Sequence, residues 1–285
     1  MLQQPISSSE KQYIILGVEQ GVRCDGRGCM DFRPMEVETG VFPQANGSVR
    51  VKIDHGATSV IAVVKCEVGE PSPSRPREGR VVVGVEISGS MFPKFDDRHA
   101  ADLQAEATGA LARVIQDSST MDTHSLCIIP GRFCWVVYVD ILVLRADGNV
   151  LDATSFAAYA ALNTARVPKL TVVPGEAGAS EDDFELSSDV ADSVPLLAQD
   201  VPVCITLSLV GRQFLVDATG AEEDCASCGA TVAVNRQGRV CGLRKIGAGG
   251  LPLPALPQLL QGAQQTASLL FPSLEAAIQN CNPQA

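Results

Sequence analysis

The segment Arg145-Ala-Asp-Gly-Asn-Val-Leu-Asp152 joins two sequence patterns and decides most of the fold. Residues 133–144 before it are apolar except for Asp140 and are rich in valine and aromatic side chains, which predicts a central β-strand. Residues 153–163 after it are rich in alanine, which predicts a helix. At such a strand–turn–helix junction, backbone amides and the helix N-terminus can hold a phosphate. The junction therefore indicates a scaffold suited to handling phosphate groups.

The side chains of this turn, however, do not suit an anion. Asp147 and Gly148 have the backbone chemistry of a tight turn. Asn149, Val150 and Leu151 follow, so the turn offers neither a hydroxyl nor a guanidinium group. Burying a phosphate dianion without charge-assisted partners costs on the order of several kcal/mol. We therefore expect a phosphate-handling scaffold whose phosphate-binding side chains have been replaced by aliphatic ones.

The composition of the 285 residues is that of a globular protein, with 46% hydrophobic and 19% charged residues. The net charge of −11 argues against independent binding to a polyanion, because nucleic-acid affinity comes largely from Lys and Arg. Residues 174–193 contain seven acidic residues and neither Lys nor Arg. This segment predicts a solvated acidic linker, and the rest of the chain is only mildly acidic.

The sequence shows no clear targeting signal and only part of a metal-binding pattern. The N-terminal residues have no signal-peptide pattern, and no apolar run reaches the roughly 20 residues of a membrane span, so we expect a soluble intracellular protein. In a reducing compartment the ten cysteines are expected to be thiols. Cys225 and Cys228 have half of a zinc-site spacing, but no second pair has the usual spacing. We therefore favour buried thiols over a metal site and expect no cofactor.

Hydrophobic periodicity predicts an α+β fold. A capping box at Ser7-x-x-Glu10 predicts a short opening helix. Further predicted strands cover residues 49–53, 60–68, 81–87, 170–173, 201–209, 213–217, 231–235 and 240–245, and predicted helices cover residues 102–116 and the run after Pro257, with a possible break at Pro272.

This order indicates two β-α-β-containing lobes of unequal size. We expect residues 1–30 to form an N-terminal helix and arm, and residues 31–168 to form lobe 1. The acidic linker would cover residues 169–200, and lobe 2 would cover residues 201–285.

Several motifs resemble those of the ribonuclease PH family. The matching stretches, in order, are Arg23-x-Asp-Gly-Arg27-x-x-x-Asp31-x-Arg33, Asp147-Gly-Asn149 with Asp152-Ala153, Val216-Asp-Ala-Thr219 with Glu222-Glu223, and Lys245-Ile-Gly-Ala-Gly249. Each motif is moderately specific, and their shared order and spacing are highly specific. The resemblance runs from about Tyr13 to the final helix and implies a ribonuclease PH-like fold.

Within the family, the resemblance is closest to a ring subunit of the RNA exosome. The stretches that carry it are Tyr13-Ile-Ile-Leu-Gly-Val18, Asp25-Gly-Arg-Gly-Cys29, Glu36-Val-Glu-Thr39 and Cys134-Trp-Val-Val-Tyr-Val-Asp140. The resemblance implies other ribonuclease PH-like ring subunits, RNA-binding cap subunits, RNA threaded through the ring and an associated hydrolytic nuclease as partners. It also implies a location in the nucleus, including the nucleolus, and in the cytoplasm, without a membrane.

Active members of the family use inorganic phosphate to cleave the 3′-terminal nucleotide from RNA. Their turn reads Asp-Gly-Gly-Thr-Arg, where this chain has residues 147–151 with Val150 and Leu151 at the last two positions. Asp217 and Glu223 fall at the family's two carboxylates and are interpreted as vestigial acids. We therefore predict a non-catalytic scaffold that lines part of the channel. The alternative is an active or half-site phosphate-dependent 3′-to-5′ exoribonuclease, since archaeal relatives of this type lend arginines to an active neighbour.

Four arginines are candidates for RNA contact. Arg75, Arg77 and Arg80 lie in a proline-rich loop that could touch phosphates or be a solvated connector. Arg98 lies where family members carry an arginine near the RNA path. Two further motif arginines, Arg27 and Arg33, are expected to pair with acids. Those acids lie either within the subunit's own fold or across a ring contact, and the sequence does not separate the two.

Overall fold

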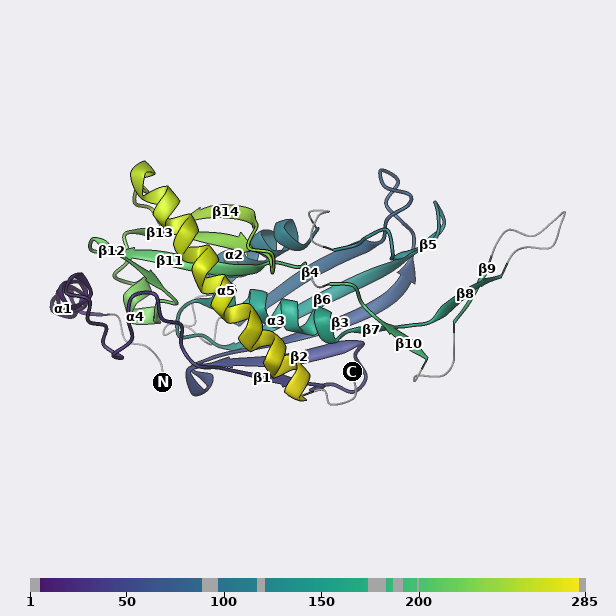
Figure 1. Cartoon of the computed structure of the whole chain (residues 1–285), viewed down its shortest axis with the longest axis horizontal. Coiled ribbons are helices and arrows are strands. Elements are labelled where there is room, and N and C mark those ends of the chain that lie inside the picture. The colour runs from purple at the N-terminus through teal and green to yellow at the C-terminus, as the bar shows by residue number, and fades with distance from the viewer. Residues whose placement is uncertain are drawn as a thin grey trace.

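The computed structural model has two lobes, each built on a β-sheet, with helices between and across them (Figure 1). It describes residues 6–88, 97–116, 121–173, 183–186, 192–198 and 200–281. No helix within these ranges is both long enough and apolar enough to cross a membrane.

Lobe 1 is built on a mixed sheet in the order β1-β2-β3-β6-β4, with β5 paired to the end of β6. Only β4 and β6 run parallel to each other. Along β6, Val137, Val139 and Ile141 are buried while Asp140 and Leu142 are exposed, so one face of the sheet carries the core. The strands are β1 (Met35–Thr39), β2 (Gly47–Ile53), β3 (Thr58–Gly69), β4 (Arg80–Ile87), β5 (Cys127–Ile129) and β6 (Phe133–Arg145).

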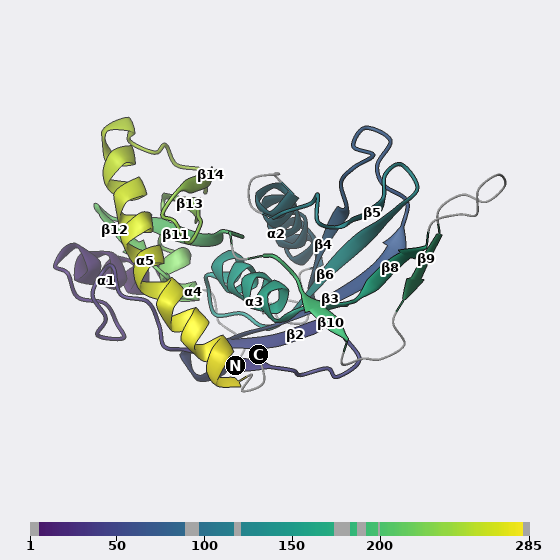
Figure 2. The ribbon, with the colours of Figure 1, turned by 45° about the vertical axis from the view of Figure 1, so that its right-hand side comes forward.

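The helix α3 (Val150–Thr164) lies between the two lobes, as Figure 2 shows. It packs against β2 and β3 on one side and against β11 (Val203–Val210) on the other, so residues 152–162 are all buried. Its alanines allow this close packing on two sides. A Cβ at Gly47 would lie 2.6 Å from the carbonyl oxygen of Ala161, so the glycine in β2 is needed for the approach. The alanine run is therefore the shared core of both lobes.

Lobe 2 has a four-stranded antiparallel sheet in the order β12-β11-β13-β14. The long helix α5 (Leu256–Cys281), shown in yellow in Figure 1, crosses both lobes and contacts β1, β11, β13 and α3. The other elements of this lobe are β12 (Gln213–Val216), α4 (Gly220–Glu223), β13 (Cys228–Val234), β14 (Val240–Ile246) and the short helix η3 (Leu253–Ala255).

Two further helices complete the fold. The opening helix α1 (Ser8–Glu19) begins at the predicted cap, where the Ser7 side chain accepts a hydrogen bond from the backbone N–H of Glu10. Ile14 and Val18 of α1 pack against lobe 2. The helix α2 (Asp97–Gln116) covers the β4 side of lobe 1.

Most predicted elements are confirmed, β6 to within one residue, while α3, α2 and β13 begin three to five residues earlier than predicted. The strand β1 was not predicted, and α5 continues through Pro272 where a break was considered. The described parts of the acidic segment also form strands, because β8 (Leu170–Val173) pairs with β9 (Asp183–Leu186), and β7 (Arg166–Pro168) pairs with β10 (Ser193–Pro195). The other described residues of the linker, at positions 169, 192, 196–198 and 200, lie outside strands, and the rest of the linker lies outside the described ranges.

Candidate functional site

The turn between β6 and α3 is pressed against the loop that follows β12 in lobe 2. Gly148 has a φ of +74°, and a Cβ there would lie 2.5 Å from the carbonyl oxygen of Ala218. Asn149 also adopts the left-handed conformation, with a φ of +54°. Thr58 of lobe 1 holds the turn from the other side, since its hydroxyl accepts from the N–H of Asp147 and donates to the carbonyl of Gly148. The phosphate-type turn is therefore a contact between the lobes.

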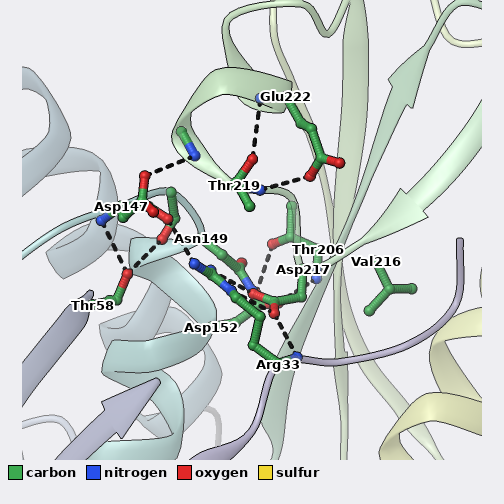
Figure 3. Close-up of polar contacts among 12 residues, drawn as sticks. Arg33, Thr58, Asp147, Asn149, Asp152, Thr206, Val216, Asp217, Thr219 and Glu222 are labelled. Atoms are coloured by element: carbon green, nitrogen blue, oxygen red, sulfur yellow. Dashed lines mark hydrogen bonds and ion pairs between the residues drawn. The ribbon is translucent and has the colours of Figure 1, made fainter. Parts of the chain in front are cut away.

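Asp217 lies at the centre of this contact and is fully buried (Figure 3). Its Oδ2 accepts hydrogen bonds from the backbone N–H of Arg33 at 2.9 Å, from Nε of Arg33 at 2.8 Å and from Nη1 of Arg27 at 3.0 Å. Its Oδ1 accepts from Nη2 of Arg33 and from Nδ2 of Asn149, each at 2.8 Å. Five donors thus occupy the lone pairs of one carboxylate.

The electrostatics of Asp217 follow from these contacts. Burial alone would raise the pKa of Asp217, but the hydrogen bonds and the charge of Arg33 outweigh it and lower the pKa. The same ion pair raises the pKa of Arg33 against the effect of burial. The carboxylate is therefore held ionised and fully bonded, which leaves no free lone pair to accept a proton from a leaving group.

The arm between α1 and β1 supplies all three arginines around the contact. Arg23 is buried and forms a two-bonded ion pair with Glu222, with Nε to Oε1 at 2.9 Å and Nη2 to Oε2 at 2.6 Å. Arg27 also contacts Asp25, and Arg33 donates to the carbonyl of Asp147. The partners of the motif arginines are thus acids of the chain's own fold.

Carboxylates of the chain also occupy the backbone amides around the turn. Oε1 of Glu223 accepts from the N–H of Asn149 at 2.7 Å, and Oδ1 of Asp147 accepts from the N–H of Gly220 at 3.4 Å. Oε2 of Glu222 accepts from the N–H of Thr219 in a capping box. The N–H of Asn149 belongs to the turn itself, and those of Thr219 and Gly220 lie at the start of α4 in lobe 2. The fold thus places its own negative charge at this junction.

The aliphatic residues predicted to replace the phosphate-binding side chains face inward. Val150 and Leu151 are both partly buried and pack against the main hydrophobic core. Asp152 follows them and is fully buried, where its two oxygens accept from the backbone N–H and the hydroxyl of Thr206 at 2.7 Å each. The first turn of α3 therefore serves packing between the lobes.

Glu223 is the most solvent-accessible acid of the contact. Nearby protein groups raise the pKa of Glu223 to about 7, chiefly by excluding water from the carboxyl group, although the residue as a whole is exposed. Asp217 and Glu223 therefore differ, because Asp217 is fully buried and Glu223 remains at the surface.

Asn149 lies in a motif that the sequence located, but its part in the contact between the lobes was not predicted. Its side chain does not cap α3 but donates to Asp217, and its Oδ1 is buried with no hydrogen-bond partner. Its position between a glycine and a helix start was the available signal, since Asn tolerates the left-handed conformation. The contact is therefore made by residues from the arm, lobe 1 and lobe 2 together.

The four arginines predicted to touch RNA do not form one group. Arg75, Arg77 and Arg80 are exposed in the loop before β4 and at its first residue, and Arg75 pairs with Glu78. Arg98 is exposed in the first turn of α2. In α2, the side chain of Gln104 accepts from the N–H of Ile87 near the end of β4, and that of Gln116 donates to the carbonyl of Val81 near its start. The helix α2 therefore runs antiparallel to β4. At about 1.5 Å per helical residue, Arg98 lies roughly 27 Å from the Arg80 end of β4.

The two cysteines with zinc-like spacing are not joined by further ligands. Cys228 is buried and its Sγ contacts the carbonyl oxygen of Gly250, while Cys225 is half-buried. In the described part of the chain, no three His, Cys, Asp or Glu side chains gather in a way that could hold a metal ion.

The fold and the two-lobe contact define a class of protein. Residues 31–168 match the model of the 3′ exoribonuclease family, domain 1, and residues 200–266 match domain 2. These matches cover more than half of the chain, so the chain belongs to this family, which confirms the resemblance to ribonuclease PH.

Individual relatives give a narrower likeness. The chain is 34% identical to the exosome complex component Rrp42 of Methanopyrus kandleri, over 94% of this chain and 97% of the relative. It is 30% identical to a Dictyostelium discoideum relative that carries the name RRP42, over 92% and 94% of the two chains. A chain in the structure of the Archaeoglobus fulgidus exosome with RNA bound to the active site superposes with a TM-score of 0.78 at 30% identity, covering 92% of this chain and 96% of that one. The sequence resemblance to ribosomal RNA-processing protein 42 is thereby confirmed.

Proposed function

We propose that this chain is a non-catalytic ring subunit of the RNA exosome that supports 3′-to-5′ RNA processing and decay. Relatives named as exosome components match nearly its whole length, and an exosome core structure has the same fold. In this role the subunit closes the ring and lines part of the channel, while a separate hydrolytic nuclease degrades the RNA. We further propose that it works in the nucleus, including the nucleolus, and in the cytoplasm.

The sealed carboxylate of Asp217 carries the non-catalytic part of this proposal. Phosphorolysis brings inorganic phosphate and an RNA diester together, which requires cationic and hydroxyl donors aimed at the anion and an accessible acid. Here Asp217 is fully bonded inside the fold, and Val150 and Leu151 pack into the core. The three arginines of the arm are already paired with internal acids.

Exposed apolar side chains support assembly with neighbours. Tyr13 of α1 is 73% exposed, Leu253 of η3 is 82% exposed and Leu269 of α5 is 74% exposed. A neighbouring subunit that covers such side chains removes apolar surface from water, which favours association. We propose that these elements bind other ribonuclease PH-like ring subunits, with RNA-binding cap subunits completing the complex.

The loop of Arg75, Arg77 and Arg80 is proposed to contact the phosphates of threaded RNA. Its guanidinium groups are exposed, whereas those of the arm are buried or paired. Arg98 would contact RNA at a separate point. It lies in the first turn of α2, whereas the last turn of α2 lies beside the Arg80 end of β4. With a net charge of −11, the subunit is expected to bind RNA weakly outside the ring.

Copurification of the tagged chain from cell extracts, followed by native mass spectrometry, tests ring membership. We expect a complex that contains one copy of this chain with related ring subunits and cap subunits, and loss of ring closure when the chain is depleted. Recovery of the chain alone, or with unrelated partners, would overturn the proposal.

The rival reading is an active or half-site exoribonuclease. It would be supported by phosphate-dependent release of nucleoside diphosphates from RNA by a ring in which substitutions in this chain abolish the release. No feature of the contact at Asp217 favours it.

A further inference from the structure

Two cysteines face each other across the β5–β6 hairpin. In the antiparallel pairing of these strands, Cys127 lies directly opposite Cys134. Directly opposed residues of an antiparallel pair point to the same face of the sheet. In the strand pairings of the described residues, no other two cysteines are opposite each other. The pair is therefore a distinct feature of lobe 1.

The geometry of the ladder brings these residues to disulfide distance. The N–H of Trp135 donates to the carbonyl oxygen of Leu126 at 2.8 Å. The pair Leu126–Trp135, next to Cys127–Cys134, is therefore a hydrogen-bonded pair. Pairs alternate along an antiparallel ladder, which makes Cys127 and Cys134 a non-hydrogen-bonded pair. The Cα atoms of such a pair lie about 4.5 Å apart, within the range of about 4.4–6.8 Å found for disulfides.

The two thiols differ in their access to solvent. Cys127 is half-buried, so it is the residue of the pair that keeps contact with solvent. Cys134 is fully buried, and burial raises the pKa of its thiol, although the nearby Arg80 guanidinium acts in the opposite direction. An accessible thiol beside a protected one is the arrangement of an attacking and a resolving cysteine.

We propose that Cys127 and Cys134 form a reversible intramolecular disulfide when the protein meets a peroxide. The Cys127 sulfur attacks one oxygen of hydrogen peroxide, giving a sulfenic acid and one water molecule. The Cys134 sulfur then attacks the sulfenic sulfur, the S–O bond breaks, and the Cys134 proton leaves with the hydroxyl group as a second water molecule. Two thiols and one peroxide thus become one disulfide and two waters, and a dithiol reverses the change.

The disulfide would brace the hairpin that anchors the arginine loop. The N–H of Gly131 in the hairpin turn donates to the carbonyl of Pro76 at 2.7 Å, and the N–H of Gly79 donates to the carbonyl of Thr123 at 2.8 Å. A Cβ at Gly79 would lie 2.3 Å from the Cβ of Leu126, so the loop sits tightly on this segment. Oxidation is therefore expected to slow opening of the loop as well as of the hairpin.

Peptide mapping of the folded full-length chain tests the proposal. Trypsin cuts after Arg132, between the two cysteines, and yields the peptides 114–132 and 133–145, each of which contains one cysteine. After treatment with one equivalent of hydrogen peroxide, we expect these two peptides to be joined with the loss of two hydrogen atoms. Treatment with dithiothreitol should separate them, and hydrogen exchange at Gly79 and Gly131 should be slower before that treatment than after it.

Variants separate this pair from the other thiols. In Cys134→Ser, the linked peptide should vanish and a sulfenic acid on Cys127 should be trapped by a cyclic 1,3-diketone. In Cys241→Ser, which removes a half-buried thiol with no opposed cysteine, the link should form as in the unchanged chain. The proposal fails if the exposed Cys24 is oxidised while Cys127 and Cys134 stay unlinked. It also fails if the urea-unfolded chain forms the same link equally well.

Discussion

Arginines of the arm and arginines of the β3–β4 loop show two uses of one side chain. Arg23 and Arg33 are buried, and each forms a bidentate ion pair with an acid of lobe 2. Arg75 and Arg77 are exposed, and only Arg75 has an acidic partner, which is itself near the surface. The number of arginines near a phosphate-type site therefore says little about anion binding. What matters is whether acidic side chains of the same fold already pair with those arginines.

The arm therefore holds the two lobes together, and the loop is an exposed cationic surface. Removing one partner of a buried ion pair leaves an uncompensated buried charge, which is strongly destabilising. Removing an exposed charge changes stability little. Four predictions follow from this contrast, and they decrease in the expected size of the effect.

The substitution Arg33→Met is expected to have the largest effect. It leaves Asp217 buried without its bidentate partner and should lower the free energy of unfolding by about 3–5 kcal/mol. Urea unfolding followed by circular dichroism measures this change. The matched substitution Arg75→Met should change stability by less than about 0.5 kcal/mol. Equal effects of the two substitutions would refute the distinction between arm and loop.

The turn itself should be nearly as sensitive. In Gly148→Ala, the new methyl group meets the carbonyl oxygen of Ala218, and the residue must also keep a φ of +74°. We expect a loss of about 3 kcal/mol or more, with a cooperative transition at lower denaturant concentration. Gly238→Ala is the control, because Gly238 has a φ of +75° but nothing within 4 Å of a Cβ. A loss at Gly148 no larger than that at Gly238 would show that the lobes do not press on this turn.

Buried acids with and without an arginine should respond differently to pH. Burial raises the pKa of Asp152 from the ordinary 3.8 to about 8, because the hydrogen bonds from Thr206 offset only part of the effect of burial. The folded state therefore binds the proton more tightly, so the stability it contributes is present below pH 3.8 and lost as pH rises towards 8.

Between pH 5 and 8, the unchanged chain should lose stability by at most about 1.4 kcal/mol per pH unit from this group. Asp152→Asn should flatten the slope, whatever its effect on stability at one pH, and thermal unfolding at a series of pH values measures the difference. Parallel slopes would indicate that Asp152 is ionised in the folded chain.

The loop arginines should have the smallest effect on the fold. Changing Arg75, Arg77 and Arg80 to Gln should leave the unfolding curve unchanged. In the assembled ring, crosslinking of RNA to this subunit should decrease, and the salt dependence of RNA binding should weaken. The effect of Arg98→Gln on crosslinking, tested separately, should add to that of the triple variant, because Arg98 lies far from the Arg80 end of β4. Unchanged crosslinking in the triple variant would show that the loop is a solvated connector.

The sequence predicted the elements well where composition is strongly biased. The strand β6 was predicted from an apolar run rich in valine and aromatic side chains, and the helix α3 from an alanine-rich run. The strand β1 was missed because only Val37 in it is buried, which is too little signal. In α5, Phe271 and Leu274 on either side of Pro272 are buried, and this packing keeps the helix continuous where local propensity predicts a break.

The site was predicted only in part. Motifs located Asp217 and Glu223, but no pattern could show that Arg33, 184 residues away in the chain, would fill the lone pairs of Asp217. Similarly, Arg80 and Arg98 are close in sequence, yet the antiparallel course of β4 and α2 places them at opposite ends. Pairings of this kind depend on the packed arrangement of elements, which local sequence does not encode.

The release of nucleoside diphosphates from 3′-labelled RNA in phosphate buffer tests the central claim most directly. The chain is assayed alone and in a ring whose other subunits have been inactivated, beside the Glu223→Gln variant, which keeps the hydrogen-bond acceptor for Asn149. Because the chain's own acids occupy the anion position, we predict no release above the buffer control from any of these samples. Phosphate-dependent release by the unchanged chain that disappears in Glu223→Gln would contradict the account.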